Sequence, residues 1–217
     1  MSKSAMILFF IITLPLLVVG KEFNPHSPQM KSRPANQGSP TKHSLLSPPV
    51  EVHFTGSPVV SLGQLGSERG NSLIVGAHLD WILECKYGIG VGVFGLSNRI
   101  KAPQLPQVDG LVLVYNYAGL QLSYIHNAHH LLHWQAAALV GVGQAFYRDD
   151  EYFAKYDQND TVIVLEPSFS LLLNVLPGIR LGGGVSYRYS GRVDLLGLSN
   201  RDLSALQTRF TILIGSF

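Results

Sequence analysis

The strongest constraint on this sequence is that apolar residues alternate with glycine or polar residues in long runs. In residues 72–85, Leu79 and Trp81 fall on one side of a strand and His78 and Asp80 on the other, because successive side chains of a strand point to opposite faces. Runs of ten to fifteen residues exceed the usual soluble strand of about 5–6 residues and suit a tilted membrane-spanning strand of about 9–11 residues with extensions. We count eight such runs: 51–62, 72–85, 87–96, 111–125, 132–146, 161–175, 179–189 and 206–217.

The connections between these runs are alternately long and short. The expected short connections are 85–86, 126–130 and 176–178, and the expected long ones are 63–71, 97–110, 147–160 and 190–205. Outer-membrane barrels have an even number of strands, short turns on the periplasmic side and longer loops outside. Pro58 lies inside the first run and predicts a sheet edge or a bulge there, because proline cannot donate to a strand ladder.

Alternation alone does not say whether the apolar face points inward or outward. A soluble eight-stranded barrel turns its apolar face to the core, whereas a membrane barrel turns it to lipid. Charged residues are 14% of the chain, against about 25% in ordinary soluble domains, and Trp81, Trp134, Tyr187 and Tyr189 fit an interfacial aromatic belt. We therefore predict an all-β fold, a closed eight-stranded antiparallel up-and-down transmembrane β-barrel; the alternative is a soluble periplasmic lipocalin-like binder of apolar ligands.

The N-terminal fifty residues differ from the rest. Lys3 precedes an apolar run from Ala5 to Val19, which has the form of a secretory signal peptide. The following stretch is rich in Pro, Ser, Asn, Gln and Lys, a composition that does not bury enough apolar surface to offset its ordering entropy. We predict a signal peptide over 1–20, a flexible segment over 21–50 and an outer-membrane barrel over 51–217.

The C-terminal third resembles a known class of protein. The segments Leu165–Glu166–Pro167, Arg180–Leu181–Gly182 and Ser186–Tyr187–Arg188–Tyr189, with a last run that ends in Phe217, are similar to small eight-stranded outer-membrane β-barrel proteins of Gram-negative bacteria. The resemblance implies a place in the cell outer membrane and two partners, the membrane lipid and, through the strand ending at Phe217, the barrel-assembly machinery. By simple alternation, however, Phe217 falls on the side of Arg209. An envelope protein is a further possible partner, and the net charge of +2 gives no reason to expect nucleic acid.

One group of charged residues is predicted to face the barrel interior. A buried charge costs several kcal/mol unless it is paired, so we expect Glu166 to pair with at least one arginine of the neighbouring runs. We interpret the group as a structural network that plugs the barrel, with a gate for a small pathway as the alternative. Its predicted members are Glu166, Arg180, Arg188, Arg209, Asp80 and Glu84.

Four histidines gather near one predicted turn. Imidazole is a common ligand of Zn, Cu or Ni, so His126, His129, His130 and His133 are a weak candidate metal site. We otherwise expect no cofactor, and the lone Cys85 allows no disulfide within the chain.

The sequence favours a non-enzymatic role, whether structural, surface-binding or as part of an envelope complex. A membrane-embedded lipid-modifying enzyme is the alternative, because His78 and Asp80 share a face and Ser123, Ser168 and Ser170 are available. No nucleophile elbow accompanies them.

Overall fold

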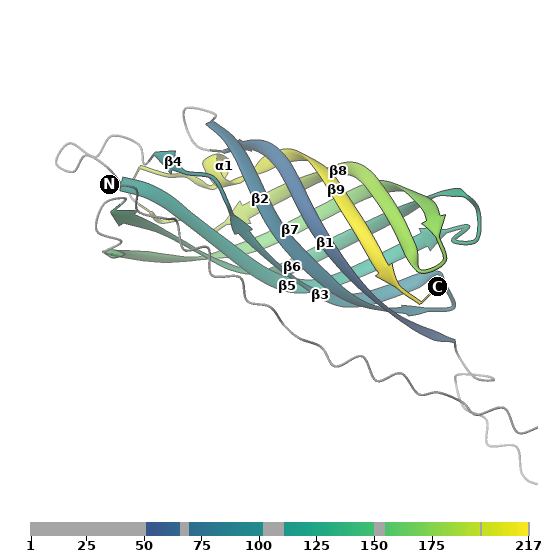
Figure 1. Ribbon diagram of the computed structural model, residues 1–217. Helices are drawn as coiled ribbons and strands as arrows, with labels where there is room; N and C mark the ends of the chain where they lie inside the picture. The colour runs from purple at the N-terminus through teal and green to yellow at the C-terminus, as the bar shows by residue number, and fades with distance from the viewer. Residues whose placement is uncertain (1–50, 66–69, 102–110, 150–154, 196, 217) are drawn as a thin grey trace, which may run out of the picture. The chain divides into compact units, whose positions relative to one another are not determined.

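The computed structural model describes residues 51–65, 70–101, 111–149, 155–195 and 197–216 (Figure 1). The predicted signal peptide and flexible segment lie outside these residues and stay predictions. In the described part of the chain, no helix is long and apolar enough to cross a membrane. The elements are β1 Val52–Leu65, β2 Gly70–Leu83, β3 Tyr87–Leu96, β4 Ile100–Lys101, β5 Leu111–His126, β6 Leu132–Asp149, β7 Lys155–Leu176, β8 Ile179–Gly191, α1 Asn200–Leu203 and β9 Ala205–Gly215.

Eight long strands form a closed antiparallel barrel. Each pairs with its neighbours in chain order, β9 pairs back with β1, and β3 pairs with β5. The remaining strand, β4, is two residues long and pairs with Val112 and Leu113 near the start of β5. Closure gives both sides of every long strand a partner along most of its length. The predicted closed eight-stranded up-and-down β-barrel is confirmed.

The apolar face of the strands points outward. Leu79, Leu171 and Val185 are 44%, 51% and 50% exposed, whereas Glu166 and Arg188 are 1% and 0% exposed. A water-soluble barrel requires the reverse arrangement, because its apolar side chains must fill the centre. The lipocalin-like alternative is therefore wrong.

Several strands run further than the sequence pattern predicted. The segment 147–160 was predicted as a long charged loop, but most of it belongs to β6 and β7, and Tyr147 is fully buried inside the barrel. Only 150–154 separates the two strands, and only 66–69 separates β1 from β2. The alternation of long and short connections is thus weaker than predicted, because strand pairing continues past the apolar band in which the pattern is clear.

Pro58 lies in the middle of β1, between two strands, so the predicted edge or bulge is wrong. It pairs with Ala77 of β2 without a register shift. On the β9 side the register passes from Gly56 to Val59 and skips Ser57 and Pro58. The barrel accommodates the missing N–H by a local gap in one ladder, while its other ladder continues.

Apolar side chains close the interior toward both ends of the barrel. At the end with the long connections, called here the loop end, the cluster includes Leu113, Tyr115 and Tyr147 from the wall. The segment 192–204, which contains α1, adds Leu195, Leu198 and Leu203 to this cluster. At the other end, called the turn end, a smaller cluster consists of Ile82, Cys85, Ile125 and Ala128. The alternation in the sequence predicts charged residues in the interior but not these apolar layers.

Substitutions at two adjacent glycines of β8, Gly183 and Gly184, test how closely the neighbouring strand approaches. A Cβ at Gly184 would overlap the carbonyl oxygen of Phe169 and lie 2.6 Å from Ser170 Cα, whereas a Cβ at Gly183 would meet nothing within 4 Å. We expect Gly184→Ala to lower the free energy of unfolding by about 1–3 kcal/mol, the usual cost of overpacking. The matched Gly183→Ala variant is expected to be neutral. Urea unfolding in lipid vesicles measures both, and equal losses would contradict the described register.

Candidate functional site: the polar interior of the barrel

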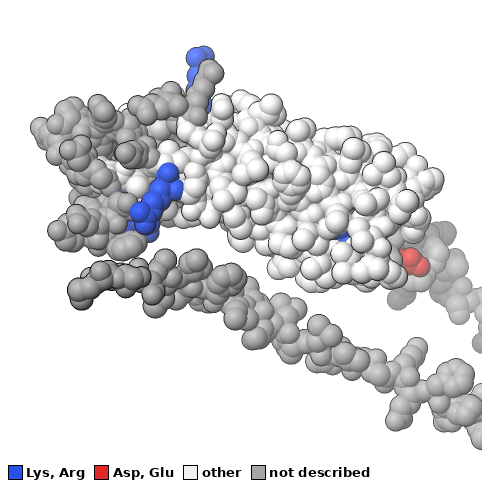
Figure 2. All heavy atoms as spheres, turned by 45° about the horizontal axis from the view of Figure 1, so that its top comes forward, with Lys and Arg blue, Asp and Glu red and all other residues white. Residues whose placement is uncertain are grey.

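A band of exposed apolar side chains surrounds the barrel. On β2 the band runs from Val75 to Leu83, which at about 3.3 Å per residue covers most of the apolar band of about 25 Å expected for a membrane barrel. In the view of Figure 2, the coloured charged side chains lie toward the two ends and the surface between them is white. This exterior matches the hydrocarbon core of a bilayer.

Inside the barrel, Glu166 and Arg209 form a buried ion pair. Arg209 Nη2 lies 2.9 Å from Glu166 Oε1, and the Tyr117 hydroxyl donates to Glu166 Oε2 at 2.5 Å. The side chains of both charged residues are at most 6% exposed. Charge-assisted hydrogen bonds of this kind are stronger than neutral ones, and they compensate part of the desolvation of the two ions.

Arg188 joins the wall of the barrel to the segment 192–204. Its Nε donates to the carbonyl oxygen of Leu203 at 3.2 Å, and its guanidinium lies 5.0 Å from the centre of the Tyr115 ring. In the amide orientation that satisfies both groups, Gln207 accepts from Arg188 Nη1 at 2.8 Å. Ser190 Oγ donates to the same Leu203 carbonyl. The cation therefore holds the end of α1 against the inner wall.

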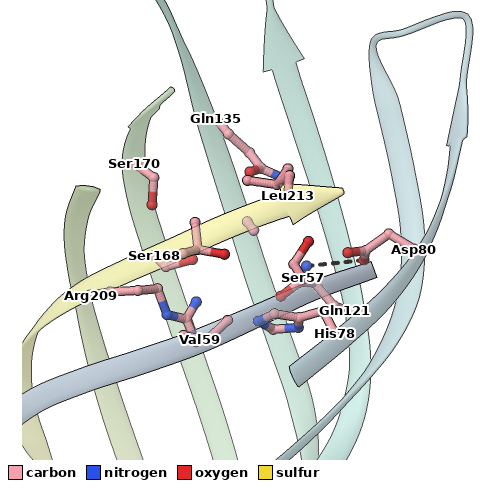
Figure 3. A pocket seen from close by; sticks show the side chains of 12 residues that line it. Ser57, Val59, His78, Asp80, Gln121, Gln135, Ser168, Ser170, Arg209 and Leu213 are labelled. Carbon is pink, nitrogen blue, oxygen red and sulfur yellow. Dashed lines mark hydrogen bonds between the residues drawn. The ribbon is translucent and has the colours of Figure 1, made fainter. Parts of the chain in front are cut away.

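A small polar cavity lies beside this network (Figure 3). His78, Asp80, Ser168 and Arg209 are among the residues that line it. Gln121 Nε2 donates to Asp80 Oδ1 at 3.1 Å, the contact drawn as a dashed line. Its volume of about 30 Å³ is room for about two water molecules. A lipid chain or a sugar does not fit in such a space.

Comparisons by fold support this architecture. The chain matches no protein-family model and no curated protein. It is similar in structure to Neisserial surface protein A, with a TM-score of 0.54 and 12% identity over 75% of this chain and 96% of that one. It is also similar to the N-terminal β-barrel domain of Pseudomonas aeruginosa OprF, with a TM-score of 0.50 and 8% identity over 77% of this chain and 99% of that one.

This chain has the fold of a small outer-membrane β-barrel. The fold and the apolar exterior together assign it to an outer membrane. In this outer-membrane barrel, the described structure brings four of the six predicted interior charges into one belt: Asp80, Glu166, Arg188 and Arg209.

The other two predicted members lie elsewhere. Arg180 is buried at the turn end, where its Nε donates to Asn174 Oδ1 at 2.7 Å and its Nη2 to the Ala128 carbonyl at 3.2 Å. Glu84 is exposed in the turn after β2 and does not face the interior. The backbone φ of Glu84 and Cys85 is +52°, so the strand alternation that placed Glu84 inside ends at Leu83.

The four histidines of the predicted metal site do not converge. His126 lies on the outer face and stacks on Trp134 with ring centres 5.0 Å apart, whereas His133 is buried with Nδ1 3.2 Å from the His130 carbonyl oxygen. His129 and His130 are exposed in the turn. Within the described ranges, no group of three or more His, Cys, Asp or Glu residues is arranged to hold a metal ion.

Sequence reasoning missed the neutral partners of the interior charges. Arg188 contacts the rings of Tyr115 and Tyr117, and it also contacts the Gln207 amide. The Tyr117 hydroxyl donates to Glu166. Ser190 Oγ contacts the Tyr115 hydroxyl and donates to the Leu203 carbonyl. One signal was available, because Tyr115 and Tyr117 fall on the inward side of β5, with Gln121 and Ser123. Bulky aromatics on the polar side of a barrel strand indicate a filled interior.

Removing one partner of the buried ion pair tests its role. Arg209→Met leaves the Glu166 carboxylate buried without its cation, so we expect a loss of about 3–5 kcal/mol in the free energy of unfolding. The double variant Glu166→Gln/Arg209→Met removes both charges and should lose less than Arg209→Met alone. Urea unfolding in vesicles, followed by tryptophan fluorescence, measures these losses. The single variant Glu166→Gln is measured in the same way. A double variant whose loss equals or exceeds the summed losses of Arg209→Met and Glu166→Gln would contradict the pairing.

Proposed function

We propose that this protein is a sealed, non-enzymatic outer-membrane barrel that anchors a structured surface at its loop end. The observation that carries the proposal is the filled interior. From the turn end to the loop end, the barrel contains the cluster around Ile82, the belt around Glu166 and the cluster around Tyr147. An eight-stranded barrel is only just wide enough for such side chains, so a structural or surface-binding role fits better than transport.

The interior also argues against lipid-modifying catalysis. His78 and Asp80 are 4% and 5% exposed and face a cavity of about 30 Å³. A membrane lipid meets the outer face of the barrel, on which these two side chains do not lie. Ser168 and Ser170 line the same small cavity, and Ser123 is buried.

The loop end offers the surface that we propose to be functional. The segment 192–204 is fixed by Arg188 and by Ser190, whose N–H donates to Ser204 Oγ at 3.0 Å. Val193 N–H also donates to Asn200 Oδ1 at 2.8 Å. Exposed charged residues on this segment include Arg192, Asp194 and Arg201. Loops on a rigid scaffold commonly carry binding functions, so we propose that an envelope or extracellular partner contacts this surface.

Assembly is the second part of the proposal. Membrane lipid is the partner of the apolar band, and we propose that the barrel-assembly machinery recognises the last strand, as expected from the sequence. Phe217 lies outside the described residues, so the aromatic end of that strand stays a prediction.

Conductance measurements test the sealed interior. We expect the full barrel, reconstituted in planar lipid bilayers, to produce no stable current steps above the bare membrane, because apolar clusters toward both ends and the charged belt between them block the lumen. The folded state of the same sample is verified by its heat-modifiable gel mobility. Reproducible single-channel steps from the folded fraction would overturn the proposal.

A further inference from the structure

A cluster of aromatic side chains carries one cation at the turn end of the outer face. Lys86 lies in the β2–β3 turn, and the adjoining ends of β3, β5 and β6 carry Tyr87, Tyr124, His126 and Trp134. We call these five residues the Lys86 patch. The register pairs Tyr87 with Tyr124, and His126 with Trp134, so the patch is one continuous surface across three strands.

The patch is held together by ring contacts. The ring centres of Tyr87 and Tyr124 are 5.7 Å apart, those of Tyr124 and Trp134 are 5.6 Å apart, and Trp134 stacks on His126. Lys86 Nζ lies 5.4 Å from the centre of the Tyr87 ring and 5.8 Å from that of Tyr124. Cation–π contact at this distance is favourable, so the ammonium is directed over the aromatic surface.

The polar groups of the patch suit an anion. The Lys86 ammonium and the Trp134 indole N–H only donate hydrogen bonds, and a tyrosine hydroxyl can donate. No carboxylate in the described part of the chain lies within ion-pair distance of Lys86. The nearest acid in sequence, Glu84, is exposed, and its backbone N–H donates to the Glu51 carbonyl on the β1 side of the turn, whereas Lys86 leans toward β5.

The position of the patch selects the kind of anion. Along β3 and β5, the next residues that face lipid are Ile89 and Leu122. They are 48% and 63% exposed and belong to the apolar band. The patch therefore borders the hydrocarbon at the depth where aromatic side chains meet lipid headgroups. A phosphate group at that depth belongs to a membrane lipid whose acyl chains lie against the band below.

We propose that the Lys86 patch binds the phosphate of an anionic phospholipid in the leaflet on the turn side of the membrane. The inference rests on the membrane position of the barrel but not on its sealed interior or on any loop-end partner. A surface cation contributes about 1 kcal/mol to the attraction of anionic lipid, which corresponds to about a fivefold preference.

The two tryptophans give a direct readout, because Trp81→Phe leaves Trp134 as the reporter inside the patch. The full chain is reconstituted in mixtures of phosphatidylglycerol and phosphatidylcholine, with one lipid at a time brominated near the headgroup end of its acyl chains. Quenching of Trp134 then gives the relative affinity of the two lipids at the patch. We expect about a fivefold preference for phosphatidylglycerol at low salt.

The matched variants decide the outcome. Lys86→Gln should reduce the preference to about one, whereas Arg192→Gln, which removes an exposed cation at the loop end, should leave it unchanged. The site would be overturned, with the membrane position intact, if both lipids quenched Trp134 equally in the protein that retains Lys86. The same conclusion would follow if Lys86→Gln and Arg192→Gln changed the phosphatidylglycerol preference equally. An absence of quenching by either lipid would overturn the membrane position, and the site with it.

Discussion

Backbone hydrogen bonding in hydrocarbon is the constraint on which this structure depends. A bilayer offers no water to the N–H and C=O groups of a strand, so a membrane-spanning sheet must close on itself. The β9–β1 and β3–β5 pairings provide that closure. With the backbone satisfied, alternate side chains can differ completely in character. Val185 faces outward, whereas its neighbour Ser186 is buried inside.

Closure also determines what the interior must do. An eight-stranded barrel encloses too little space for bulk water, so each interior charge needs a partner supplied by the protein. Glu166 has Arg209 and Tyr117, and Arg188 has the Leu203 carbonyl and two aromatic rings. Because the Leu203 contact belongs to the segment 192–204, the polar belt also fixes the chain at the loop end. One network thus stabilises the wall, fills the lumen and orders the surface that we propose to be functional.

The sequence predicted the parts of this fold that depend on alternation. Strand identity, the outward position of Leu79 and Leu171 and the inward position of Glu166 follow from a period of two. Features that depend on where alternation stops were predicted poorly. Glu84 lies outside the interior because the backbone turns after Leu83, and the charged composition of 147–160 predicts a loop where β6 and β7 continue.

Partners across the barrel were also beyond the sequence. Glu166 and Arg209 lie on β7 and β9, which are separated by β8, and alternation shows only that both point inward. Whether Arg209 or Arg188 pairs with Glu166 depends on the tilt and stagger of the strands, which the sequence does not give. Tyr117 could be expected inside but not assigned to Glu166. The histidines illustrate the reverse case, because four residues close in sequence are divided between the outer face, the turn and the interior.

Spin-label accessibility along β2 tests the central claim most directly. Single nitroxide labels at consecutive positions from 74 to 82, read in lipid vesicles, report collision with oxygen, which concentrates in hydrocarbon. The account predicts a period of two, with high oxygen accessibility at Val75 and Leu79 and low values at Ile74 and His78. High oxygen accessibility at Ile74 and His78 with low values at Val75 and Leu79, or the absence of any period of two, would contradict it.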